Sequence, residues 1–114
     1  MEKIDLYVSL SPEEAAEKVR TAVAGSFSGE MIDEYKRTLP DGKEIVMILF
    51  EKFYMRSSNR ATLTFLADNL EEKTKVHLSG GGSGGMFFRF DWGAGASFAE
   101  LAVNALKEYR CELF

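Results

Sequence analysis

The sequence predicts an α+β fold: an antiparallel sheet of about five to six strands in the order β-α-β-β-β-β-β-α, with two helices packed on one face. Apolar and polar residues alternate from Ile4 to Leu10, which is typical of a half-buried strand. Residues 12–24 and 97–110 instead carry apolar side chains at helical spacing. The segments between them are joined by turns of hairpin length, which favour antiparallel pairing.

Local signals place each element. Ser11 and Glu14 have the spacing of a capping box and Pro12 suits the first helical position, so the first helix begins there and ends before Gly25. The weak pattern of residues 30–39 predicts a strand near an edge of the sheet. The other expected strands are residues 44–56, 61–67, 74–79 and 86–92. The second helix has a clean apolar stripe: Phe98, Leu101, Ala102, Ala105, Leu106 and Tyr109.

Composition limits the class of protein. The 114 residues suit a single domain, residues 1–114, and 46% of them are hydrophobic, which is enough for a core. The net charge of −4 with scattered Lys and Arg argues against a nucleic-acid partner. The longest apolar run, residues 45–50, is too short to cross a membrane, and the N-terminus lacks the pattern of a signal peptide. With a single cysteine, Cys111, we expect a cytoplasmic protein.

The run Gly80, Gly81, Gly82, Ser83, Gly84, Gly85 is the most unusual segment. It matches the spacing of a dinucleotide fingerprint and of a nucleophile elbow, but both motifs must lead into a helix. Here a strand pattern follows, so we expect no cofactor and interpret the run as a bend or bulge between two strands. A binding loop built from these six residues stays open as the alternative.

His77 is the only histidine and lies on the outward side of its strand pattern. No Cys or His has the spacing of a metal ligand, so we expect no metal site. Glu51 and Asp91 are the carboxylates considered as partners of His77 across the sheet, and a solvated side chain is the simpler interpretation.

Large apolar side chains fall on both faces of the expected sheet, although the helices cover one face only. The apolar side chains that the helices do not cover predict an apolar pocket or a subunit interface. The expected partner is a second copy of the chain, in a homodimer, or a small apolar ligand. The residues concerned are Phe53, Met55, Met86 and Phe87.

Several segments together resemble a small uncharacterised bacterial family, catalogued as a domain of unknown function. They are Phe50-Glu51-Lys52-Phe53, Asn59-Arg60-Ala61-Thr62-Leu63, Ser79-Gly80-Gly81-Gly82-Ser83 and Met86-Phe87-Phe88-Arg89-Phe90. The resemblance covers residues 44–110 and implies a bacterial cytoplasmic protein, without assigning an activity or site residues.

Two classes of function therefore remain. The first is a non-enzymatic binding or interaction module that uses an apolar pocket or a sheet face. The alternative is a small enzyme or anion-binding domain centred on the Gly80–Gly85 loop with Ser83 and His77. The first is favoured because neither glycine motif has the helix that it requires.

Overall fold

The computed structural model describes residues 3–54, 59–82 and 97–112. A six-stranded sheet has the order β2-β3-β4-β5-β1-β6, and every neighbouring pair is antiparallel. Its strands are β1 (Lys3–Val8), β2 (Glu30–Thr38), β3 (Glu44–Tyr54), β4 (Asn59–Glu71), β5 (Lys73–Gly82) and β6 (Arg110–Cys111). The expected α+β class with an antiparallel sheet is confirmed.

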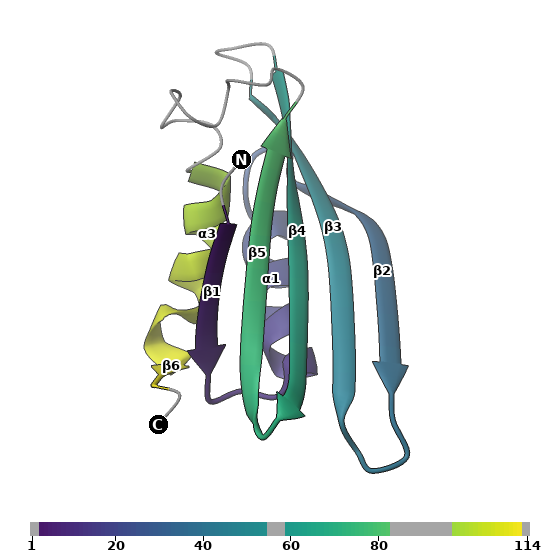
Figure 1. Cartoon of the computed structure of the whole chain (residues 1–114). Coiled ribbons are helices and arrows are strands. Elements are labelled where there is room, and N and C mark those ends of the chain that lie inside the picture. The colour runs from purple at the N-terminus through teal and green to yellow at the C-terminus, as the bar shows by residue number, and fades with distance from the viewer. Residues whose placement is uncertain (1–2, 55–58, 83–96, 113–114) are drawn as a thin grey trace.

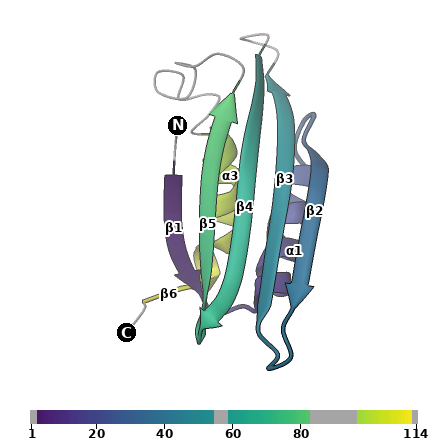
Figure 2. The same ribbon diagram turned by 45° about the vertical axis from the view of Figure 1, so that its right-hand side comes forward.

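Both helices lie on one face of the sheet, α1 (Pro12–Ala24) behind β3 and β4 and α3 (Ser97–Leu106) beside it (Figures 1 and 2). The capping box of α1 is present: the Glu14 amide donates to Ser11 Oγ over 3.1 Å, and the Ser11 amide donates to Glu14 Oε1 over 2.9 Å. The bounds predicted for this helix, including its end before Gly25, are confirmed.

The core lies between the helices and the sheet. It contains side chains that are almost fully buried: Val19 and Val23 from α1, Phe98, Ala102 and Leu106 from α3, and Leu6, Val8, Val46, Ile48, Phe50, Leu63, Phe65, Val76 and Leu78 from the strands. Leu101 and Ala105, expected inside, are partly buried against this core. The apolar stripe of the second helix therefore faces the sheet.

The C-terminal end differs from the expected single helix to residue 110. α3 ends at Leu106 and is followed by a 3₁₀ turn (Lys107–Tyr109) and by β6, which pairs with β1. The Tyr109 carbonyl accepts a hydrogen bond from the Ser9 amide over 2.8 Å, and the Lys18 ammonium lies 5.2 Å from the centre of the Tyr109 ring. These tertiary contacts hold Tyr109 at the end of the stripe although the α-helix has already ended.

The expected strand over residues 86–92 lies outside the described residues. None of the helices in the described part of the chain has the length and apolar run needed to cross a bilayer.

Candidate functional site

The face of the sheet opposite the helices, here called the open face, carries a belt of apolar side chains. The register aligns five residues across five strands in one row: Tyr35, Met47, Leu66, His77 and Asp5. Ile45 and Leu49 flank Met47 on β3, because side chains two residues apart share a face. Within the described residues, no helix covers this face (Figure 2).

These apolar side chains are less buried than those of the core. Ile45, Met47, Leu49 and Leu66 are half-buried, whereas Val46, Ile48 and Phe65, their neighbours along β3 and β4, are 0% exposed. Tyr35, at the β2 end of the row, is 49% exposed. The sequence prediction that large apolar groups occupy both faces of the sheet is thus confirmed for β3.

Charged and polar side chains surround the belt. Arg37, Ile45, Asp68, Lys75 and Tyr7 form the next row across the sheet, and Leu49 lies in a row with Asp33, Thr64, Ser79 and Lys3. An apolar centre with a polar rim of both charges is the composition of many protein–protein contact surfaces.

Of the residues expected to form an apolar pocket or interface, Phe53 is described. It is the next-to-last residue of β3 and lies on the open face, is half-buried, and has the Arg60 guanidinium 5.8 Å from its ring centre. Met55, Met86 and Phe87 lie outside the described residues. No site prediction from the sequence included Tyr35, Ile45, Met47, Leu49 or Leu66. The alternation in residues 44–50 nevertheless carries the signal for the three residues on β3.

His77 also lies on the open face, where β1 supplies its carboxylate partner. Its Nδ1 atom is 2.6 Å from Oδ1 of Asp5, which is directly opposite in the β1–β5 pair. The partners considered from sequence do not fill this role: Glu51 contacts Arg60 over 2.8 Å, and Asp91 lies outside the described residues. Asp5 was missed because a contact 72 residues apart has no local signal.

The His77–Asp5 pair is open to solvent, with side chains 35% and 52% exposed. The described residues contain no group of three or more His, Cys, Asp or Glu that is arranged to hold a metal ion. The chemistry shown here is that of a solvent-exposed histidine–carboxylate hydrogen bond across two strands.

The glycine run does not begin with a bend. Gly80, Gly81 and Gly82 extend β5 and lie opposite Leu63, Thr62 and Ala61 of β4, so the expectation of a bend or bulge is wrong for these three residues. A Cβ atom at Gly81 would lie 3.0 Å from Thr62 Oγ1, which shows the close approach that favours glycine there. Ser83, Gly84 and Gly85 lie outside the described residues.

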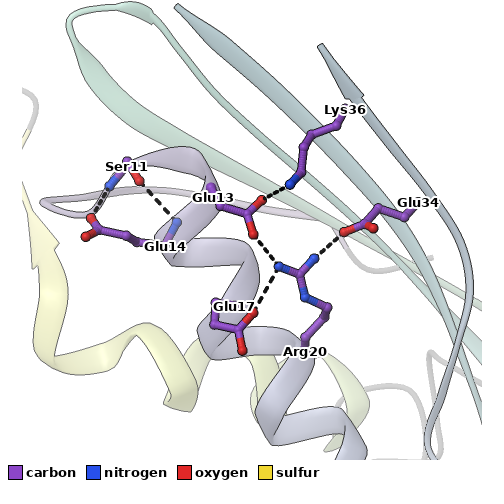
Figure 3. Close-up of polar contacts among 7 residues, drawn as sticks. All are labelled: Ser11, Glu13, Glu14, Glu17, Arg20, Glu34 and Lys36. Carbon is purple, nitrogen blue, oxygen red and sulfur yellow. Dashed lines mark hydrogen bonds and ion pairs between the residues drawn. The ribbon is translucent and has the colours of Figure 1, made fainter. Parts of the chain in front are cut away.

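A charged cluster joins α1 to β2 on the helix side of the sheet (Figure 3). Arg20 Nη2 lies 2.5 Å from Glu13 and 3.1 Å from Glu17, while its Nη1 contacts Glu34. Lys36 Nζ lies 2.8 Å from the other oxygen of Glu13. Partial burial acts to raise the pKa of Glu13, but the bonds from Lys36 and Arg20 outweigh it, and the net shift is downward from 4.5.

Next to this cluster is a groove of about 280 Å³ between the C-terminal half of α1 and the start of β2. Its walls are mostly apolar: Val23, Ala24, Met31 and Phe50, with Glu17 and Arg20 at one side. Because Arg20 already contacts three carboxylates, this groove offers little free positive charge to an anion.

Comparison with known proteins shows the family to which the chain belongs. A family model described as a family of unknown function, DUF6054, matches residues 1–110. The chain belongs to this family. The DUF6054 match includes the first strand and helix, so it is wider than the resemblance over residues 44–110. No curated protein and no solved structure matches the chain.

Proposed function

We propose that this DUF6054 chain is a non-enzymatic interaction module whose open face binds a folded protein partner. The observation that carries the proposal is the row Tyr35, Met47 and Leu66, with Ile45 and Leu49 beside it, on a face that no described helix covers. When apolar area of this kind is buried against another surface, it contributes about 25 cal/mol of favourable free energy per Å² removed from water.

The shape of the face supports a macromolecular partner. Five strands span about 19 Å across the sheet, and all five overlap from Ile45 to Leu49, about 13 Å along it, which gives an area of about 250 Å² before the extension of β3 and β4 to Phe53. Stable protein contacts bury about 800 Å² per partner, and weaker ones bury less. Small molecules prefer concave sites that enclose them, whereas a sheet face is broad and shallow.

The chemistry of the face specifies the partner further. Its apolar centre favours a patch of aliphatic or aromatic side chains, and the rim offers cations at Arg37 and Lys75 and anions at Asp33 and Asp68. A partner with a ring of mixed charge around an apolar centre would match it in both respects.

The enzyme or anion-site alternative has less support. Gly80–Gly82 are paired with β4, and the His77–Asp5 pair is solvent-exposed. We further infer a bacterial cytoplasmic location, supported by the family resemblance and by the free thiol of Cys111, which is the sole cysteine.

Photo-crosslinking tests this proposal in the cells from which the protein comes. A p-benzoylphenylalanine is placed at position 66 on the open face or, as a matched control, at position 104, where Asn104 is exposed on α3. We expect one dominant adduct with another protein from position 66 and none from position 104. Equal labelling from both positions, or no adduct from position 66, would overturn the proposal, as would an adduct containing two copies of this chain.

A second arm measures the face itself with a defined probe. Purified parent protein should bind the apolar dye bis-ANS, and Leu66→Glu should reduce the fluorescence several-fold because it places a charge in the belt. Asn104→Glu serves as the matched control and should leave the signal unchanged. Equal fluorescence of the parent and Leu66→Glu would count against an accessible apolar surface on the open face.

A further inference from the structure

β2 forms one edge of the sheet, where β3 is its only partner among the described strands (Figures 1 and 2). All nine of its residues are exposed. Its outer side therefore presents backbone N–H and C=O groups to any further strand. On this strand the Glu34 amide donates a hydrogen bond to the Asp33 side chain over 2.9 Å.

Exposed apolar side chains gather at the same edge. Among the described residues, five large apolar residues are exposed, and four of them are Phe27, Met31, Ile32 and Tyr35. All four belong to β2 or to the segment that leads into it. A concentration of this kind on a free edge indicates a contact surface.

The charges of β2 are arranged in two halves. Asp33 and Glu34 precede Tyr35, and Lys36 and Arg37 follow it. After the register shift between Met31 and Asp33, the even-numbered residues face the helices, since Glu34 contacts Arg20 and Lys36 contacts Glu13 of α1. Tyr35 lies opposite Met47, on the open face, and Asp33 and Arg37 share that face with it.

From these observations we propose that two copies of the chain pair through their β2 strands in antiparallel fashion, with Tyr35 of one copy opposite Tyr35 of the second. This register puts Asp33 opposite Arg37 on the open face and Glu34 opposite Lys36 on the helix face. The twofold axis repeats both contacts, so four pairs of opposite charge face one another and no like charges do.

Other registers are excluded by face and by charge. Directly opposite residues in a sheet share a face, so even-numbered residues must pair with even-numbered ones, and a slip must be of two residues per step. One such slip places Glu34 opposite Glu34 of the second copy, and the slip in the other direction places Lys36 opposite Lys36. Like charges directly opposite destabilise a pair of strands.

Charges on an edge strand often prevent pairing, and the register of β2 shifts between Met31 and Asp33, as at a bulge. That irregularity limits the paired segment to the part of β2 after it. An acidic half followed by a basic half gives each of these four charges an opposite charge across the axis in antiparallel self-pairing, an order that edge protection alone does not require. The inference goes beyond the proposed function and does not depend on it; in the dimer the two open faces would join beside the Tyr35 pair.

Charge exchange tests the pairing by sedimentation equilibrium. The parent should have twice the 12.8 kDa mass of one chain at micromolar concentration. Asp33→Arg and Arg37→Asp should each be monomeric, because each variant places two like-charged pairs across the axis. Mixed in equal amounts they should form a heterodimer, since every Arg then faces an Asp. Melting temperatures establish that each variant is folded.

A disulfide then tests the register. Tyr35→Cys in a Cys111→Ser background should form a covalent dimer on mild oxidation, because opposite residues of an antiparallel pair bring their Cα atoms within about 5.5 Å. Asp33→Cys in the same background should not, since its two copies would be about 13 Å apart along the strands. A monomeric parent, a mixture that stays monomeric, or equal cross-linking at positions 33 and 35 would overturn the proposal.

Discussion

Arg20 Nη2 lies 2.5 Å from Oε2 of Glu13, seven residues earlier on α1, and the same guanidinium reaches Glu34 on β2. Charged groups thus attach the edge strand β2 to α1, although all nine residues of β2 are exposed. The pairing with β3 fixes which face each β2 residue presents, and the part of the attachment made by Glu13 depends on the ionised state of its carboxyl.

The first prediction concerns acid stability. The folded-state pKa of Glu13 lies below its unfolded value of 4.5, so the stabilisation from its carboxylate is fully present above pH 4.5 and is lost as the pH falls through the folded pKa. Glu13→Gln should lower the free energy of unfolding at neutral pH by about 1 kcal/mol or less, since the side chain is 36% exposed.

Urea unfolding of parent and variant at neutral pH and at several values below 4.5 measures this difference. We expect the gap between the two midpoints to shrink only in the acid range. Asn104→Gln, an exposed amide on α3 that carries no titrating group before or after the change, is the control and should show no such pH-dependent gap. A gap that stays the same down to the acid limit would contradict the role given to Glu13.

The second prediction concerns the core. Leu106 is 0% exposed at the end of α3, so Leu106→Ala should lower the free energy of unfolding by about 2–5 kcal/mol through lost apolar contacts and the cavity left behind. Asn104→Ala, at an exposed position of the same helix, should change it by about 0.5 kcal/mol or less. Equal urea midpoints for the parent and Leu106→Ala would mean that the apolar stripe of α3 does not face the core.

The third prediction concerns the approach of β4 and β5. A Cβ atom at Gly81 would lie 3.0 Å from Thr62 Oγ1, so Gly81→Ala should destabilise the protein by about 1 kcal/mol. In a Thr62→Ala background the close contact is gone, and the same change should be neutral or favourable because alanine orders a strand at lower entropic cost than glycine. A double-mutant cycle on denaturant midpoints measures this coupling, and identical costs of Gly81→Ala in both backgrounds would refute it.

Elements with local signals were predictable from the sequence. The first helix has its capping residues next to it in the chain, and the polar pattern of residues 30–39 predicted the edge strand. The position of β1 between β5 and β6 has no such signal, and for this reason Asp5 was missed as the partner of His77. β6 is two residues long and, among the described strands, pairs with β1 alone, so its formation depends on tertiary contacts and not on a local sequence signal.

The glycine run shows why the candidate site was harder to predict than the fold. Glycine is rare within strands, so Gly80–Gly82 favoured a bend, whereas the pairing with Leu63, Thr62 and Ala61 continues the strand. The open face was predictable only in part, because alternation tells which side chains share a face but not which face the helices cover.

The last prediction follows from the pairing of Gly80–Gly82 with β4. The backbone of Gly80, Gly81 and Gly82 is aligned with β4, so these residues do not form the loop before a helix that holds a pyrophosphate. Millimolar ATP, NAD or FAD should therefore leave the melting temperature unchanged relative to sodium sulfate at the same ionic strength. A ligand present at 100 times its dissociation constant would add about 2.7 kcal/mol, which corresponds to about 10 °C for a chain of this size. A reproducible increase with any of the three nucleotides, absent with sulfate, would instead identify the Gly80–Gly85 segment as a phosphate site and favour the enzyme or anion-binding alternative.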